Sequence, residues 1–123
     1  MLEEGVNRYP TQPPHVEQQN GVAIVGLNSL EPLDVYTTMS YRSGLIDALN
    51  DPTNTAVVAD ISNCEFIDAA GLAALTSALK LSRQLKKAFV IDNTGTEQAH
   101  IMKAFTITGL DKLFQIVVEK PQP

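Results

Sequence analysis

Residues that hold metals or cross-link a chain are scarce in this sequence. Its 123 residues include one cysteine, two histidines and no tryptophan. One cysteine excludes an intramolecular disulfide and any structural zinc site that needs several cysteines. The histidines, His15 and His100, are far apart and lack the spacing of metal ligands. We therefore expect neither a bound metal nor another cofactor.

The chain also lacks an excess of basic residues and any long apolar segment. Its net charge is -5 and its pI is about 4.8, which argues against nucleic acid as a partner because phosphate binding needs a basic face. No apolar stretch approaches the ~20 residues that span a bilayer. The first residues, MLEEGVNRYP, have no basic end followed by an apolar run, so they do not resemble a signal peptide. We expect a cytoplasmic protein that does not insert into membranes.

Common catalytic motifs are missing as well. There is no glycine-rich phosphate loop, no Ser/His/Asp or Cys/His combination, and no acidic pair like that of a receiver domain. Asp60 and Asp68 remain as candidates for acid–base chemistry or a metal site. A structural role explains both, because Asp68 can cap a helix and Asp60 can bond to the loop after its strand. Cys64 is expected in a loop or partly buried, as a small apolar filler.

Length and composition fit one globular domain. The sequence is 44% hydrophobic and 19% charged, and a chain of 123 residues is long enough to bury a core. Residues 1–14 contain three prolines among polar residues and are predicted to form an extended tail. Residues 120–123 are predicted to be a frayed end. The folded domain is therefore expected over residues 15–119.

Strands and helices alternate along this predicted domain. Asn20-Gly21 is a strong turn signal, and the segments on either side are expected to pair as a hairpin. Apolar residues at helical spacing follow, with Pro32 suited to the first turn of that helix. Gly109 is predicted to end the last helix. The predicted strands are 15–19, 22–27, 55–61, 88–94 and 112–119, and the predicted helices are 32–50, 70–87 and 96–109.

This order of elements, β-β-α-β-α-β-α-β, indicates an α/β fold. Strands that alternate with helices form a mixed, largely parallel β-sheet layered with helices. The segment TAVVADI, residues 55–61, is apolar and rich in β-branched residues, so it is expected at the centre of the sheet and buried on both faces. The first hairpin strand is expected at an edge.

The predicted helix 70–87 has a wide apolar face. Leu72, Leu75 and Leu79 form one stripe along it, and a second apolar stripe lies beside the first. Two interpretations remain open. Either the helix is wedged deeply between neighbouring elements, or its N-terminal end, around residues 69–73, stays exposed so that a partner's backbone can approach the small residues there.

The segment VVADISNCEFIDAAGLAAL resembles the signature of the STAS domain, a family that includes bacterial anti-sigma factor antagonists. In that family a strand ends in Asp-Leu-Ser, and an aromatic residue, an apolar residue and Asp-Ser-Ser-Gly-Leu follow at the start of a helix. The matching residues here are Asp60, Ile61, Ser62, Phe66, Ile67, Asp68, Gly71 and Leu72. FTITGLDKLFQI is similar to the family's closing segment, and VAIVGLNSL to its second strand, with Asn28 in place of the usual aspartate. The resemblance covers about residues 15–119.

The resemblance implies a small domain without catalytic activity. Antagonists of this family bind a serine-kinase anti-sigma factor and so release the sigma factor. The kinase phosphorylates the second serine of Asp-Ser-Ser-Gly, and the added charge abolishes binding. Ala69 and Ala70 replace both serines here, so the phosphoacceptor is lost at Ala70. Neither Ser62 nor Thr76 is a simple replacement, and binding is expected to resemble that of a permanently unphosphorylated antagonist.

The same resemblance implies a partner-binding surface made of Asn28, Ser29, Asp68, Ala69, Ala70, Gly71 and Leu72. Other roles stay open at this point. STAS-like domains also serve as cytoplasmic subunits of lipid transporters or as parts of larger signalling assemblies, and the lost serine fits these roles too. A third alternative is an enzyme that uses Asp60 and Asp68. The sequence also leaves open the identity of the partner, the formation of a homodimer and any redox role of Cys64.

Overall fold

The computed structural model describes residues 13–119. Most of the predicted tail 1–14 and all of the predicted tail 120–123 therefore lie outside the described residues. The strands are β1 (His15–Gln19), β2 (Val22–Gly26), β3 (Glu31–Leu33), β4 (Ala56–Asp60), β5 (Cys64–Ile67), β6 (Ala88–Asn93) and β7 (Gln115–Val118). The helices are α1 (Thr38–Asn50), α2 (Ala69–Leu85), α3 (Gln98–Thr108) and the short 3₁₀ helix η1 (Leu110–Lys112).

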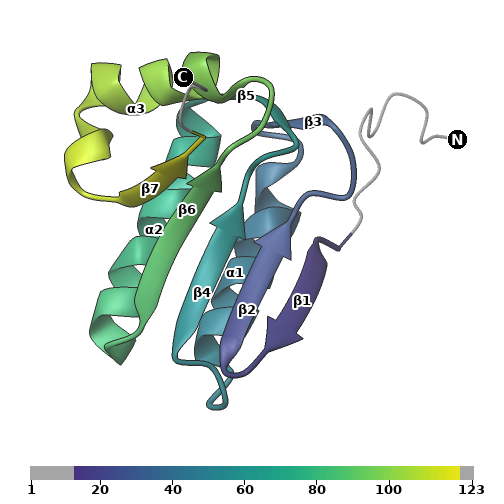
Figure 1. The fold of residues 1–123 in the computed structure, drawn as a ribbon, viewed down its shortest axis with the longest axis vertical. Helices are drawn as coiled ribbons and strands as arrows, with labels where there is room; N and C mark the ends of the chain where they lie inside the picture. The colour runs from purple at the N-terminus through teal and green to yellow at the C-terminus, as the bar shows by residue number, and fades with distance from the viewer. Residues whose placement is uncertain (1–12, 120–123) are drawn as a thin grey trace, which may run out of the picture.

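The α/β fold predicted from the sequence is confirmed. The main sheet has the order β1-β2-β4-β6-β7, so β4 lies at its centre and β1 at one edge, as expected (Figure 1). β1 pairs antiparallel with β2, and the pairs β2–β4, β4–β6 and β6–β7 are parallel. The hairpin turn uses Asn20 and Gly21, whose φ angles of 51° and 82° are the positive values that a two-residue type I′ turn requires.

The core lies between the main sheet and two helices. α1 and α2 contact each other and lie behind the sheet in the view of Figure 1. Leu45 of α1 and Leu75 of α2 are fully buried, as are Val57 and Ala59 of β4. Val58 points to the other face of the sheet and is only half-buried. The central strand is therefore fully buried on its helix-covered face alone, which corrects the prediction of burial on both faces.

The first helix starts later than the sequence predicts. Pro32 lies in β3 and not in a helical turn, and α1 begins at Thr38. Asp34 explains the delay, because its Oδ1 accepts hydrogen bonds from the backbone N–H groups of Tyr36 and Thr37 and so holds a turn ahead of the helix. β3 has a single neighbour, and a strand with one open side accommodates the missing N–H of proline.

A strand also replaces the loop that the sequence predicts around Cys64. β5 runs parallel to β3, with Glu31 opposite Cys64 and Leu33 opposite Ile67. The two strands are short and pair with each other outside the main sheet, so the alternation that marks a long strand is absent from their sequences. This small sheet brings Leu33 and Ile67 to the start of α2, where the candidate site lies.

The C-terminal part follows the prediction closely. Gly109 ends α3 with a φ angle of 76°, a left-handed conformation that glycine adopts without strain. η1 forms the turn that leads into β7. Phe105 of α3 packs edge-on against Phe114, with ring centroids 5.6 Å apart, and both rings are buried. This contact fixes the end of α3 against the final strand of the sheet.

Candidate functional site

The candidate site is built around the first turn of α2. Asp68 precedes the helix, and its Oδ1 accepts a hydrogen bond from the backbone N–H of Gly71 at 3.1 Å. This is the N-cap predicted from the sequence, and it satisfies one of the helix's unpaired N–H groups. The backbone N–H of Asp68 donates in turn to the carbonyl of Leu33 at 3.3 Å. The start of the helix is thus fixed to β3.

Residues of the first turns divide into a buried and an exposed set. Gly71 and Leu72 are buried, and 8% of the surface of Leu72 is exposed. Ala69 and Ala73 are exposed, and Ala70 is half-exposed. One side of the wide apolar face is therefore wedged into the core, while its N-terminal end presents three alanines to solvent.

The start of α1 lies directly beside this turn. The hydroxyl of Thr38 contacts the carbonyl of Ala70, at an O–O distance of 3.4 Å. Three large apolar side chains of the same segment are exposed: Val35 at 63%, Tyr36 at 55% and Met39 at 75%. Exposed apolar side chains that cluster on one surface are typical of binding sites. These three residues lie outside the surface predicted from the sequence.

The pair Leu33-Asp34 is the sequence signal that could have identified the segment before α1 as part of the site. The STAS resemblance implies an aspartate after a leucine, a position that the sequence-based prediction gives to Asn28. This segment is joined to the start of α2 by the carbonyl of Leu33, which accepts from the N–H of Asp68, and by the hydroxyl of Thr38, which donates to the carbonyl of Ala70. Asp34 follows Leu33 and is 8% exposed, with its carboxylate engaged in the turn that starts α1.

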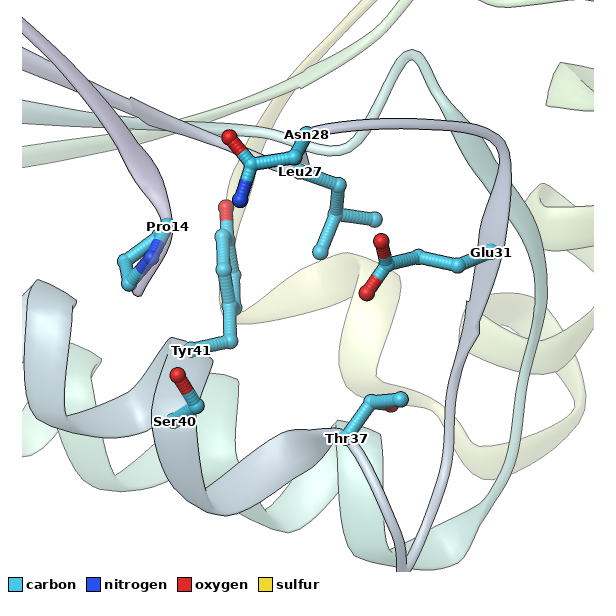
Figure 2. Close-up of a pocket in the computed structure, with 7 residues that line it drawn as sticks. All are labelled: Pro14, Leu27, Asn28, Glu31, Thr37, Ser40 and Tyr41. Carbon is cyan, nitrogen blue, oxygen red and sulfur yellow. The ribbon is translucent and has the colours of Figure 1, made fainter. Parts of the chain in front are cut away.

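Asn28 and Ser29 lie in the loop after β2 and are exposed. Asn28 donates from Nδ2 to the carbonyl of Pro13 at 2.6 Å, and Ser29 donates to the carboxylate of Glu31 at 3.3 Å. Figure 2 shows Asn28 and Glu31 at a small cavity above Tyr41. Its volume of about 10 Å³ is room for one water molecule. The structure thus ties these two residues to the N-terminal segment and β3, and no hydrogen bond joins them to Ala70 in the part described.

Comparison with known proteins agrees with this architecture. A model of the STAS domain matches residues 13–120 of the 123. The chain belongs to the STAS domain family. Three solved structures are similar to this STAS domain over most of their length. An anti-sigma factor antagonist from Mycobacterium paratuberculosis is 25% identical, with a TM-score of 0.66, covering 87% of this chain and 89% of its own.

The two other structures share the fold at lower identity. A candidate anti-sigma factor antagonist from Thermotoga maritima is 18% identical, with a TM-score of 0.73, covering 87% of this chain and 86% of its own. An anti-sigma-factor antagonist (STAS) domain protein from Planctomyces limnophilus is 13% identical, with a TM-score of 0.71, covering 89% of this chain and 92% of its own.

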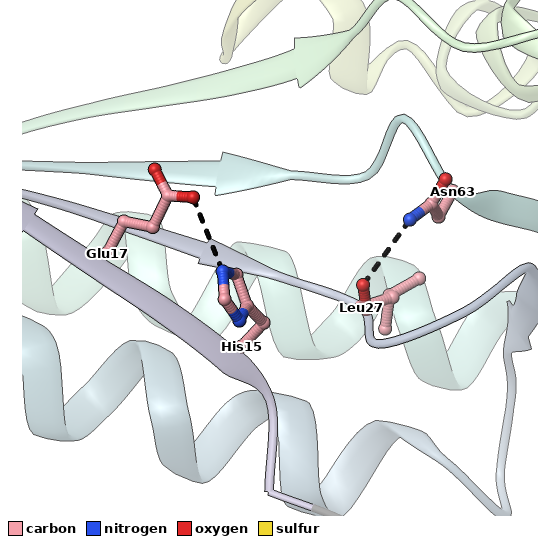
Figure 3. Close-up of polar contacts among 4 residues, drawn as sticks. All are labelled: His15, Glu17, Leu27 and Asn63. Atoms are coloured by element: carbon pink, nitrogen blue, oxygen red, sulfur yellow. Dashed lines mark hydrogen bonds and ion pairs between the residues drawn. The ribbon is translucent and has the colours of Figure 1, made fainter.

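The loop between β4 and β5 of the STAS domain holds Asp60 in a structural role. Asp60 Oδ1 accepts hydrogen bonds from the backbone N–H and the hydroxyl of Ser62, at 3.0 and 2.7 Å. Asn63 then donates from Nδ2 to the carbonyl of Leu27 at 3.4 Å, which ties this loop to the end of β2 (Figure 3). These contacts match the structural explanation of Asp60 given by the sequence.

The hydroxyl groups near the site are also engaged. Ser62 donates to Asp60, and Thr76 donates to the carbonyl of Leu72 at 2.8 Å. Both side chains are half-buried. A kinase would have to break these bonds to reach either oxygen, and at Ser62 the phosphate would also face the carboxylate of Asp60.

Cys64 is a buried residue of β5, with 1% of its surface exposed. The pKa of its thiol is raised to about 12, chiefly because the buried thiolate would lose its hydration; backbone hydrogen bonds at Leu33 and Phe66 oppose this, and the carboxylates of Glu31 and Glu65 add to it. A thiol that stays protonated and covered is a poor nucleophile, so the geometry gives no support to a redox role. The small apolar role predicted from the sequence agrees with its burial.

Residues 13–119 contain neither a candidate metal site nor a candidate membrane span. No group of three or more histidine, cysteine, aspartate or glutamate side chains in this part of the chain could hold a metal ion. None of its helices is long and apolar enough to cross a membrane.

Proposed function

We propose that this STAS domain is a regulatory module that binds a serine-kinase anti-sigma factor in the bacterial cytoplasm and thereby frees a sigma factor. Three things support the proposal: the family, the similarity to an antagonist at 25% identity, and the exposed apolar residues around the start of α2. The module acts by binding and carries out no catalysis of its own. Asp60 and Asp68, the two carboxylates considered for an enzyme, are both engaged in structural hydrogen bonds.

The start of α2 is the single observation that carries the proposal. Asp68 caps the helix, while Ala69 and Ala70 occupy the solvent-facing positions where the family places serines. A serine at such a position receives phosphate, and the added charge of about -2 disrupts an apolar interface. A methyl group accepts no phosphate, so the docking surface of this STAS domain is permanently in its binding form.

The proposed surface consists of Asp68, Ala69 and Ala70 together with Val35, Tyr36 and Met39. Thr38 joins the two segments through its contact with Ala70. Small alanines let the partner approach the helix closely, and the three larger side chains offer the apolar area that anchors protein interfaces. Gly71 and Leu72 support this surface from below, since both are buried.

The experiment compares two substitutions of the same size. Purified kinase-type anti-sigma factors of the source organism are titrated with wild-type protein, Ala70→Glu and Ala70→Gln. We expect the glutamate to weaken binding at least tenfold more than the glutamine, because it places an unpaired charge in the interface. The proposal fails if no such kinase binds the wild-type protein, or if both variants bind as tightly as wild type.

A further inference from the structure

A groove continues the proposed docking surface along α2. It has a volume of about 450 Å³. One wall is α2, from Ala69 through Ala73 and Thr76 to Lys80, and the other comes from the end of α3 and η1, at Thr108 and Leu110. Arg83 donates to the carbonyl of Leu113 at 3.2 Å, and this bond holds α2 and the segment after η1 together. Figure 1 shows α3 at the end of the molecule where α2 begins.

The shape and chemistry of the groove restrict what can occupy it. Ala69 and Lys80 are 11 positions apart, which corresponds to about 16 Å or three helical turns. Beyond the first turn of α2, the backbone groups along the groove are paired within the helix and offer no hydrogen bonds to an extended strand. An occupant must satisfy its own backbone, as a helix does. Alanine side chains on α2 permit the axial separation of roughly 8 Å that close helix packing needs.

Lys80 gives the groove its electrostatic character. It is the one charged side chain among the residues that line the groove, and it is exposed. Within residues 13–119 it makes no hydrogen bond and no ion pair, so its ammonium group is free to meet an anion. Asp111 and Lys112 follow Leu110 and cancel in net charge. A complementary occupant carries a carboxylate where it meets Lys80.

We infer that the groove between α2 and α3 binds an amphipathic helix of the partner protein, about three turns long, with small apolar residues facing α2 and an acidic residue at the Lys80 end. The inference rests on the proposed function, because the groove begins at Ala69 and continues the same docking surface. It adds a second contact area to the anti-sigma factor interface. In this area Lys80 favours a partner that carries a negative charge.

The test uses two synthetic peptides of about fourteen residues, each stapled because short isolated helices are marginal in water. They share one apolar stripe and differ in the last turn, which carries glutamates in one and lysines in the other. Amide chemical shifts of ¹⁵N-labelled wild-type protein report binding. We expect the acidic peptide to shift amides of residues 69–80 and 108–110 and to bind roughly two- to fivefold more tightly, the scale of one exposed ion pair.

Two variants with the same charge change complete the experiment. Lys80→Glu should reverse the preference between the peptides, whereas Lys103→Glu, on α3 outside the groove, should leave it unchanged. The inference is overturned if neither peptide shifts the groove amides, if wild type binds both equally, or if Lys80→Glu keeps the wild-type preference. An unchanged spectrum outside the groove verifies that each variant is folded.

The two proposals fail in different ways. If the peptides behave as expected but no kinase-type anti-sigma factor binds, the groove is supported as a helix-binding site and the proposed function is contradicted. If a kinase binds and hydrogen exchange shows protection at residues 35–39 and 68–70 but none along residues 73–80 and 108–110, the proposed function stands and the groove inference falls.

Discussion

Gly71 lies where β3, β5 and α2 meet, and it leaves no space for a side chain. A Cβ atom added there would lie 2.7 Å from Cγ1 of Ile67 and would also collide with the carbonyl oxygen of Leu33. Backbone atoms of β3 cannot yield without shifting the strand. The glycine of the family signature is therefore a packing requirement at this site, and its role in docking is indirect.

We predict that Gly71→Ala lowers the free energy of unfolding by about 1–3 kcal/mol, the usual cost of overpacking a core position. Urea denaturation measures the change. Ala73→Ser, two residues further on and on the exposed side of α2, serves as the control and should stay within about 0.5 kcal/mol of wild type. Equal stability of Gly71→Ala and wild type would contradict the described packing.

A second prediction at the scale of the residue concerns Cys64 and the stability of the fold at alkaline pH. Its folded-state pKa is raised from 9.0 to about 12, so the folded protein keeps the thiol proton after the unfolded chain has lost it. Stability linked to this group is therefore complete below pH 9 and decreases as the pH rises through about 12. Cys64→Ala should remove this component of the alkaline stability loss.

Thiol reactivity checks the burial of Cys64 directly. Ellman's reagent at pH 8 should label the native protein only slowly, at the rate of opening, and the urea-unfolded protein within the mixing time. Rapid labelling of the native protein would show an accessible thiol and would reopen a redox role.

At the scale of elements, the start of α2 depends on one side chain. Asp68 is the only polar cap of that helix start, through its bond to Gly71. We predict that Asp68→Ala destabilises the fold by about 1 kcal/mol, because an N–H group loses its partner, whereas Asp68→Asn retains most of the stability. Thermal melting of the three proteins measures this. A melting temperature for Asp68→Ala equal to that of wild type would count against the cap.

The elements that the sequence predicts well are those with strong local signals. Asn20-Gly21 marks the hairpin, Gly109 marks the end of α3, and long apolar segments mark β4 and β6. The start of α1 and the strands β3 and β5 are determined by contacts between distant segments instead. Leu33 pairs with Ile67, and Asp34 holds a turn, so Pro32, a good first-turn residue in isolation, lies in a strand.

The same distinction applies to the candidate site. The signature locates Asp68 to Leu72 correctly at a helix start, because the motif is contiguous in sequence. It does not reveal that Gly71 and Leu72 are buried, or that Thr38 contacts Ala70 while the nearby side chains of Val35, Tyr36 and Met39 are exposed. These facts depend on how α1 packs against α2, which no local pattern encodes. The loop residues Asn28 and Ser29 remain a prediction that rests on the resemblance alone.

At the scale of the whole molecule, one α/β layer positions the candidate site. The main sheet and the buried sides of α1 and α2 supply stability, and the first turns of both helices converge at one end of that layer (Figure 1). The chain's net charge of -5 means that a strongly acidic partner surface would be repelled except at local cations such as Lys80. Recognition is therefore expected to be apolar at the centre, with specificity set by few charges.

The central claim is that this STAS domain lacks the switch that phosphorylation provides. The most direct measurement is its affinity for a binding kinase-type anti-sigma factor before and after incubation with ATP, with mass spectrometry of the product. Wild type should keep its affinity and carry no phosphate at residues 68–72, Ser62 or Thr76, whereas Ala70→Ser should gain one phosphate and lose at least tenfold in affinity. Phosphate on wild-type Ser62 or Thr76 together with weakened binding would contradict the account.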